Sequence, residues 1–380
     1  MRSIAEHVQA ILVGSGWHPS LFRSEMEILC RNRPFRFGTR VMLVDSNYDF
    51  FENLNRSATL DECLSPFGLT TDISSLEDVI EGWINENNLK LIKGKSIAVR
   101  WVRIEGGING LNGQKLAKFC GKILKNNGWK IDLESPDVEL MIIIDGISEH
   151  IFWGKRIISK HPRDGWVQRV ATERPFFKPI SLDPRLARVA LNFVIRNSET
   201  IICDPMCGTG GVLLEGALLN QPMVGIDLDL EMVKGSKENL EWLEQHNLDL
   251  KLQNVYHGNA VNVNELLENK NIRIGGVVFD PPYGKNAWKS EKRKDLFLDV
   301  LKNIRKANGI LFGAGLVCFL PIKPGLHGVN EPINGEIDLG DYSTTQLKLE
   351  FNKMGWEIMG MHAIPIHGSL ARMLVYANAI

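Results

Sequence analysis

Apolar runs of strand length recur along the C-terminal half of this 380-residue chain, and helical patterns alternate with them. Short apolar runs bounded by turns are typical of buried strands. Four of them, with the loops that follow, are expected to be successive strands: 201–203, 224–227, 255–260 and 277–279. The alternation predicts a doubly wound, mainly parallel sheet. An antiparallel last strand is expected within 360–377, with Pro365, His367 and Gly368 at the bend of a terminal hairpin.

The N-terminal half is patterned differently. Residues 1–55 hold short apolar runs around a polar segment and are expected to form an α+β, ferredoxin-like region. Further on, strand patterns at 97–104 and 138–144 flank a helical pattern at 116–124, which predicts a compact α+β module. The expected division of the chain is 1–55, 56–152, a basic linker at 153–180, and 181–380.

Composition narrows the class of protein. With 44% hydrophobic and 23% charged residues the chain resembles an ordinary soluble globular protein, and its length suggests two or three domains. The net charge of -1 gives no overall nucleic-acid signature, so a polyanion would have to bind local basic patches. No apolar run approaches membrane-spanning length and no signal segment is evident, so a cytoplasmic protein without membrane contact is expected.

The six cysteines contain no C-x-x-C pair. Cys203 ends a strand-like run, whereas Cys207 lies in a Gly-rich turn four residues later. Buried free thiols are therefore expected in place of a disulfide or a zinc site, and no bound metal is expected.

The strongest local charge bias lies at 153–188, where nine lysines and arginines stand against three acidic residues, a net charge of +6. Trp166, Phe176 and Phe177 are interleaved with these charges. One interpretation is a solvated linker whose aromatic side chains dock on the next domain. The other is an electrostatic path for phosphates, and both can hold together.

A Gly-rich turn, Asp-Pro-Met-Cys-Gly-Thr-Gly-Gly at 204–211, joins the first of these strands to an apolar helix. Its glycines let a ligand approach the backbone closely. The third position of a dinucleotide fingerprint is occupied by Leu213, and no Lys-Ser/Thr pair follows, so neither that fingerprint nor a P-loop is present. Asp204 before the turn suits a cationic ligand, such as the amino group of S-adenosylmethionine.

Polar residues also end the next two strands. Asp227 follows the glycines by roughly twenty residues, the spacing at which α/β nucleotide sites bind ribose hydroxyls. Asn259 can hydrogen-bond an adenine edge. Asp204 or Asp227 alone could cap a helix, but polar residues at all four strand ends in this order favour a nucleotide site.

The fourth strand ends abruptly in Asp-Pro-Pro-Tyr at 280–283, because proline cannot donate to a sheet ladder. An exocyclic amine on a base is a poor nucleophile, since its lone pair is delocalised into the ring. Asp280 and the Pro281 carbonyl can accept its N–H bonds and aim the lone pair, while Tyr283 stacks on the base. The alternative is an aspartate that caps the next helix and a tyrosine that fills a core gap. A Pro-Cys nucleophile for covalent cytosine methylation is absent here.

These motifs carry a family resemblance. From residue 181 to the end, the turn at 204–211 and the motif at 280–284 resemble class I S-adenosylmethionine-dependent methyltransferases of the amino-methylating type. The pattern at 131–140 and the strand after it resemble the THUMP domain of RNA-modifying enzymes. Together they resemble the archaeal tRNA guanine-10 N2-methyltransferase family and its eukaryotic counterparts. Asn259 is a departure, because the family usually has Asp there.

The resemblance implies a C-terminal Rossmann-like class I methyltransferase, α/β with a mainly parallel seven-stranded sheet, behind an N-terminal α+β THUMP-containing region. It implies mono- and dimethylation of guanine N2 in tRNA by a monomer or by a complex with a small activating subunit. An N-methyltransferase for rRNA guanine or for adenine, and an RNA-binding protein without catalysis, stay as alternatives.

The candidate site residues fall into three groups. The catalytic residues expected are Asp280, Pro281, Pro282 and Tyr283. The S-adenosylmethionine-binding residues expected are Asp204, Met206, Gly208, Gly210, Asp227, Leu228, Asn259 and Asp280. RNA binding is expected from the THUMP-like module, the basic segment and a loop at 285–294 of net charge +4, through Lys155, Arg156, Arg163, Arg169, Arg174, Lys178, Lys285, Lys289 and Arg293.

Overall fold

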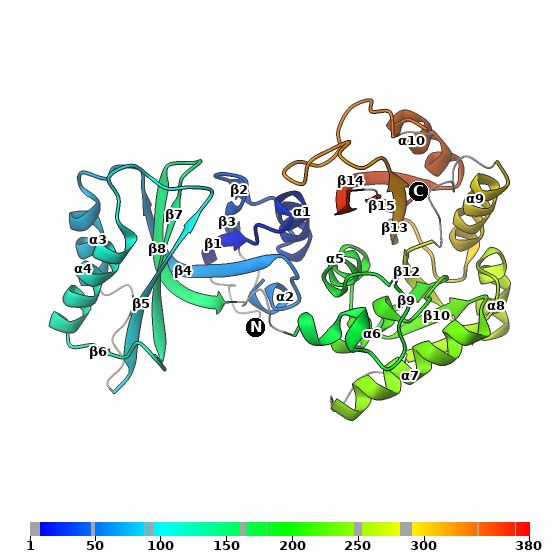
Figure 1. Cartoon of the computed structure of the whole chain (residues 1–380), viewed down its shortest axis with the longest axis horizontal. Helices are drawn as coiled ribbons and strands as arrows, with labels where there is room; N and C mark the ends of the chain where they lie inside the picture. Colours follow the sequence, from blue (N-terminus) through cyan, green and yellow to red (C-terminus); the bar gives the residue numbers. More distant parts are fainter. Residues whose placement is uncertain are drawn as a thin grey trace, which may run out of the picture. The chain divides into compact units, whose positions relative to one another are not determined.

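The computed structural model describes residues 8–46, 50–86, 89, 94–159, 165–179, 181–246, 253–281, 291–339, 342–368 and 370–380. The chain divides into two units (Figure 1). The first comprises Met1–Asn55 and Thr59–Pro162, and the second comprises Arg56–Ala58 and Arg163–Ile380. Within the described part of the chain, no helix has the length and apolar character needed to cross a membrane.

The first unit contains one eight-stranded sheet of order β2-β3-β1-β4-β8-β7-β5-β6. Its strands are β1 Val8–Gly14, β2 Phe35–Arg36, β3 Val41–Ser46, β4 Leu60–Thr70, β5 Ser96–Ile104, β6 Lys130–Ile131, β7 Val138–Asp145 and β8 His150–Ser159. Its helices are α1 Pro19–Leu29, α2 Phe51–Leu54, α3 Leu76–Asn85 and α4 Gly113–Asn126. β5 runs parallel to β6 and β7, and the other pairs are antiparallel. The α+β class expected for this half is therefore confirmed.

Helix α4 illustrates why this sequence folds locally as it does. Asn112 caps it, since its Oδ1 accepts from the amide of Lys115 at 3.0 Å. Leu116, Cys120 and Leu124 recur at helical spacing, and all are buried in one hydrophobic cluster with β5 and β7. The helix thus closes one face of the sheet.

Two expected boundaries fall inside this sheet. The division after residue 55 lies between α2 and β4, which belong to the same unit except for Arg56–Ala58. β8 continues to Ser159, so Lys155 and Arg156 are strand residues and not part of a linker. The strand forms because its apolar residues, such as Phe152 and Trp153, are buried in the core.

The second unit contains a seven-stranded sheet of order β11-β10-β9-β12-β13-β15-β14. The strands are β9 Ile201–Asp204, β10 Met223–Asp227, β11 Gln253–His257, β12 Ile274–Phe279, β13 Gly315–Ile322, β14 Trp356–His367 and β15 Leu370–Ala379. The first five in the order are parallel, and β15 is antiparallel to both β13 and β14. The mainly parallel sheet and its terminal hairpin are confirmed. Pro365 and His367 were expected at the bend, but they lie in β14 and pair with Ala371 and Leu370, so only Gly368 of the three expected residues lies outside the strands.

Helices cover both faces of this sheet. The helical segments are η1 Val167–Arg169, η2 Ala171–Glu173, α5 Pro184–Val194, α6 Gly211–Leu218, α7 Leu230–His246, η3 Ala260–Asn262, α8 Val263–Asn269, α9 Glu291–Lys306 and α10 Thr344–Lys353. On one face, a Cβ on Gly315 would lie 3.0 Å from Cα of Val194, so α5 approaches the strands closely. On the other, Phe297 and Phe351 from α9 and α10 are buried against the strands.

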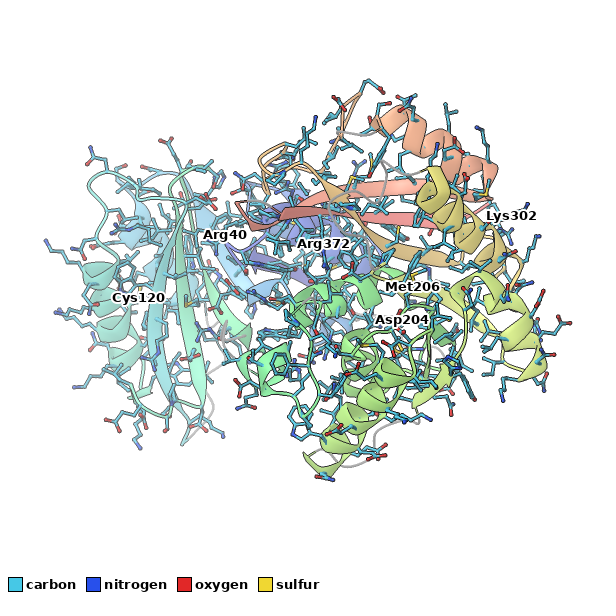
Figure 2. All side chains as sticks on the ribbon, turned by 45° about the vertical axis from the view of Figure 1, so that its right-hand side comes forward. Arg40, Cys120, Asp204, Met206, Lys302 and Arg372 are labelled. Carbon is cyan, nitrogen blue, oxygen red and sulfur yellow. The ribbon has the colours of Figure 1, made fainter. Side chains whose placement is uncertain are left out.

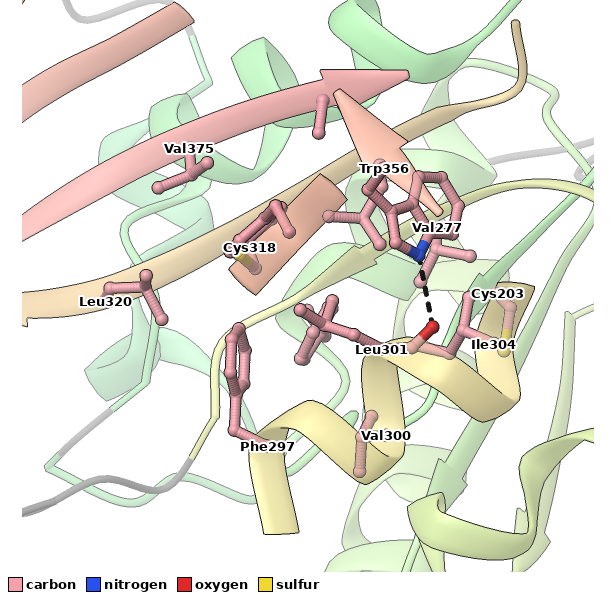
Figure 3. Packing of buried hydrophobic residues seen from close by; sticks show 14 of the residues in the cluster. Cys203, Val277, Phe297, Val300, Leu301, Ile304, Cys318, Leu320, Trp356 and Val375 are labelled. Atoms are coloured by element: carbon pink, nitrogen blue, oxygen red, sulfur yellow. Dashed lines mark hydrogen bonds between the residues drawn. The ribbon is translucent and has the colours of Figure 1, made fainter. Parts of the chain in front are cut away.

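A buried aromatic side chain connects the terminal hairpin to helix α9. Trp356 at the start of β14 is fully buried, and its Nε1 donates to the carbonyl oxygen of Leu301 at 3.1 Å (Figure 3). The bond satisfies the indole N–H that burial would otherwise leave unpaired. The hairpin is thereby tied to α9, and the strand ends beside α9 are held rigidly.

Candidate functional site

A cavity of about 980 Å³ opens at the carboxyl ends of β9, β10, β11 and β12 in the second unit. This is the edge at which open α/β sheets bind ligands. Eight of the predicted catalytic and cofactor-binding residues line it: Asp204, Met206, Gly208, Asp227, Leu228, Asn259, Asp280 and Pro281. Gly210 lies in the same turn but is not among the lining residues. Asp280 and Arg372, which are 92 positions apart in sequence, meet there.

The Gly-rich turn has a left-handed backbone that only glycine adopts without strain. Gly208 and Gly210 have φ of +52° and +78°, and Gly210 is the N-terminal cap of α6. The amide of Gly208 donates to Oδ2 of Asp227 at 2.8 Å, which couples the turn to the end of β10. A Cβ on Gly208 would meet nothing within 4 Å, so the turn leaves an open cradle for a ligand.

Helix α7 holds this turn from behind, through two residues that the sequence analysis did not single out. Ser236 Oγ donates to the carbonyl oxygen of Gly208 at 2.6 Å. Asn239 is fully buried, and its Nδ2 donates to the carbonyl oxygens of Thr209 at 2.9 Å and Phe176 at 2.7 Å. Its Oδ1 accepts from the amide of Phe176 at 3.0 Å. The available signal was a pair of small polar residues at i and i+3 on the buried face of an otherwise amphipathic helix.

Three carboxylates give the cavity its electrostatic character. Asp204 is 2% exposed, and burial raises its pKa well above the usual range, with further increases from the charges of Asp227 and Asp280. One of its oxygens, Oδ1, accepts from the amide of Met206 at 3.1 Å. Because a buried cluster of like charges is costly unless compensated, the site favours a cationic ligand.

Asp280 is paired with an arginine that the sequence analysis missed. Arg372 on β15 donates from Nη1 to Oδ2 of Asp280, and Figure 2 labels Arg372 together with Asp204 and Met206. Burial raises the pKa of Asp280 to about 6, although the guanidinium opposes this increase. The signal was a single charge within the apolar run that forms β15, but its partner could not be identified without the register of the hairpin.

The third strand end has a double role. Oδ1 of Asn259 accepts from the amide of Val261 at 3.0 Å and caps the η3 turn. Beside it, Nε2 of His257 lies 2.9 Å from the carbonyl oxygen of Leu228, and both residues line the cavity. Asn259 is thus a cap and a wall residue at once.

Three described arginines of the basic segment, Arg169, Arg174 and Arg188, have partners inside the second unit. Arg169 and Arg188 both pair with Glu215, at 2.8 and 2.7 Å, and Glu215 is 1% exposed. Arg174 is 4% exposed and donates from Nε to the carbonyl oxygen of Arg169. Arg174 is therefore buried in the second unit, and its role in RNA binding stays a prediction.

The remaining basic candidates are dispersed. Arg156 pairs with Glu62 and Glu139 in the first unit, which neutralises it, and Lys155 precedes it on β8. Lys178 pairs with Glu231 at 2.7 Å and lines the cavity. Outside the described residues lie Arg163, Pro282, Tyr283, Lys285 and Lys289, and also the side chain of Arg293.

Comparison with known proteins finds methyltransferases that are similar to parts of this chain. Residues 172–314 match the family described as RMKL-like, methyltransferase domain. A Methanocaldococcus jannaschii protein named tRNA (guanine(10)-N2)-dimethyltransferase is 31% identical over 57% of this chain and 61% of its own length. Proteins of the same name from Pyrococcus abyssi and Methanothermobacter thermautotrophicus are 28% and 32% identical, over 76% and 59% of this chain and 82% and 62% of theirs.

The matched segment thus spans less than two thirds of the first of these relatives. The resemblance noted from the motifs at 204–211 and 280–284 is confirmed for the methyltransferase part, and the THUMP-like module stays a prediction. Residues 172–314 of the second unit are similar to the RMKL-like methyltransferase domain, and the chain is similar to archaeal proteins named tRNA (guanine(10)-N2)-dimethyltransferase.

Proposed function

We propose that this chain transfers a methyl group from S-adenosylmethionine to the exocyclic N2 amine of a guanine in tRNA, at the position 10 that the names of its relatives give. The observation that carries the proposal is the position of Asp280. Its carboxylate lines the cavity formed by the Gly-rich turn and Asp227, at the strand end where a base amine would have to meet a methyl donor.

The residues present fit S-adenosylmethionine. Asp204 suits its ammonium group, and the open space at Gly208 suits the methionine part. Asp227 suits the ribose hydroxyls and Asn259 an adenine edge. When bound, this cofactor supplies an already activated methyl group, so the protein mainly has to align the acceptor.

Asp280 is suited to that alignment. With a pKa near 6 its side chain is mostly ionised at neutral pH, so it accepts hydrogen bonds from a base amine. The Pro281 carbonyl is a second acceptor at the same strand end. After transfer, the proton that the amine loses can move to a carboxylate oxygen of Asp280. A stacking role for Tyr283 and the need for a small activating subunit stay predictions.

The test uses the full chain, S-adenosylmethionine and unmodified tRNA transcripts with guanine or adenine at position 10. Nucleosides are separated by mass after digestion. We expect N2-methylguanosine or N2,N2-dimethylguanosine from the guanine transcript only. Methylated adenosine among the products would overturn the proposed target amine. Equal amounts of N2-methylguanosine from both transcripts would overturn the proposed position in the tRNA.

A further inference from the structure

The register of the sheet puts Arg372 beyond the end of β12. Phe279, the last residue of β12, pairs with Cys318 of β13, and Cys318 pairs with Val375 of β15. Arg372 pairs with Pro321 instead, further along β13. β13 and β15 therefore extend past the point where β12 gives way to Asp280, and Arg372 stands at the mouth of the cavity that both residues line.

The guanidinium retains capacity for a ligand. Its Nη1 donates to Oδ2 of Asp280, and their side chains are 19% and 17% exposed. Among the described residues Asp280 is the one recorded hydrogen-bond partner of this group. A guanidinium has five N–H donors in a fixed planar fork, so most of them stay available on the side of the cavity.

Asp280 and Arg372 together form an acceptor next to a fork of donors. Guanine presents the opposite pattern, an N2 amine that donates and an O6 oxygen that accepts. Adenine can also offer a donor beside an acceptor, its N6 amine next to N1 or N7, so the pair alone does not exclude adenine. What distinguishes guanine is the oxygen atom O6 that the arginine would bind.

We infer that Arg372 donates a hydrogen bond to O6 of the target guanine while Asp280 accepts from its N2 amine, so that Arg372 helps to position the guanine for transfer. This inference rests on the proposed function. Two simpler roles make different predictions: a counter-ion that only orients Asp280, and a contact to an RNA phosphate.

The test removes the two proposed partners separately and together. Arg372→Met and Arg372→Lys are compared with the wild-type chain on tRNA with guanine or 2-aminopurine at the target position, since 2-aminopurine keeps the N2 amine but lacks O6. Single-turnover rates are measured with RNA and S-adenosylmethionine saturating. 2-Aminopurine also lacks the hydrogen that guanine carries on N1. This difference is the same for every enzyme variant, so it cancels when the ratios of the guanine rate to the 2-aminopurine rate are compared between variants.

For the wild type we expect 2-aminopurine to react about ten to a hundredfold more slowly than guanine, because the arginine loses its charged hydrogen bond. In Arg372→Met the preference for guanine over 2-aminopurine should be mostly lost. Arg372→Lys keeps a hydrogen-bond donor, so it should keep part of this preference. Tyr376→Phe, which changes a β15 residue bonded to Arg196, is the matched control and should keep the wild-type ratio.

Equal losses on both RNAs in Arg372→Met would overturn the inference and leave a role in orienting Asp280. A loss confined to RNA affinity would overturn it in favour of a phosphate contact. If the wild type methylates no guanine, the proposed function itself fails. If it does, and the ratio is the same in Arg372→Met, only this inference fails.

Discussion

The two sides of the cavity are held in different ways. The turn side, defined as Asp204, Gly208 and Asp227, is fixed by several short hydrogen bonds to its own backbone and to α7. The amine side, defined as Asp280, Pro281 and Arg372, depends on one ion pair between two distant strands. Under the proposed function, this difference predicts a division of labour in which the turn side binds the cofactor and the amine side orients the reacting amine.

Substitution of Asp280 should cause the largest loss of methylation rate. Asp280→Ala removes the acceptor that orients the amine, and misplacement of a reacting group alone lowers a rate by about a hundredfold. Single-turnover methylation with tRNA and S-adenosylmethionine saturating measures it. Asp299→Ala, an exposed carboxylate on α9, is the control and should react normally. A near-normal rate for Asp280→Ala would mean that Asp280 is a structural partner of Arg372 and not the acceptor of the amine.

Asp227 should mainly affect binding. Asp227→Ala removes both the proposed ribose contact and the acceptor for the Gly208 amide. Loss of a charged hydrogen bond costs about 1.5–3 kcal/mol, so the affinity for S-adenosylmethionine should fall roughly tenfold or more. Titration calorimetry measures this affinity. An unchanged Kd would remove Asp227 from the site.

Replacing Asn239 should weaken cofactor binding less than replacing Asp227 does. Asn239→Leu keeps the shape but leaves the carbonyl of Thr209 and both backbone groups of Phe176 without their partner. We expect lower thermal stability and, because the turn loosens, a severalfold weaker affinity for S-adenosylhomocysteine. Gln221→Met removes a buried bond at the opposite end of β10 and is the control. Equal losses of affinity in both variants would deny Asn239 a positioning role.

The pH dependence of the methylation rate tests how Arg372 affects Asp280. Asp280 acts in its ionised form, so the rate should fall as the pH drops through its pKa of about 6. The nearby guanidinium lowers this pKa, so removing it should raise the pKa further. In Arg372→Met the acidic limb of the single-turnover rate should therefore move to higher pH. A limb that stays in place would show that the ionisation of Asp280 does not control the rate.

Sequence alone predicted the residues whose role depends on local structure. Asp204, Asp227 and Asp280 each follow an apolar strand directly, and parallel strands bring their carboxyl ends to one edge. Arg372 was missed because its partner depends on the register of an antiparallel hairpin far along the chain. The burial of Arg174 was not predictable, because a charge run has the same sequence whether it faces water or packs inside the protein, where Arg174 donates to the carbonyl oxygen of Arg169.

The most direct test of the division of labour measures cofactor affinity in the variant expected to lose rate, and measures rate in the variant expected to lose affinity. The affinity of Asp280→Ala for S-adenosylmethionine is measured by calorimetry, and the rate of Asp227→Ala is measured with that cofactor saturating. We expect near wild-type affinity for the first variant and a near wild-type rate for the second. Weak binding by Asp280→Ala together with a slow saturated rate for Asp227→Ala would show that the two sides act as one unit and would contradict this account.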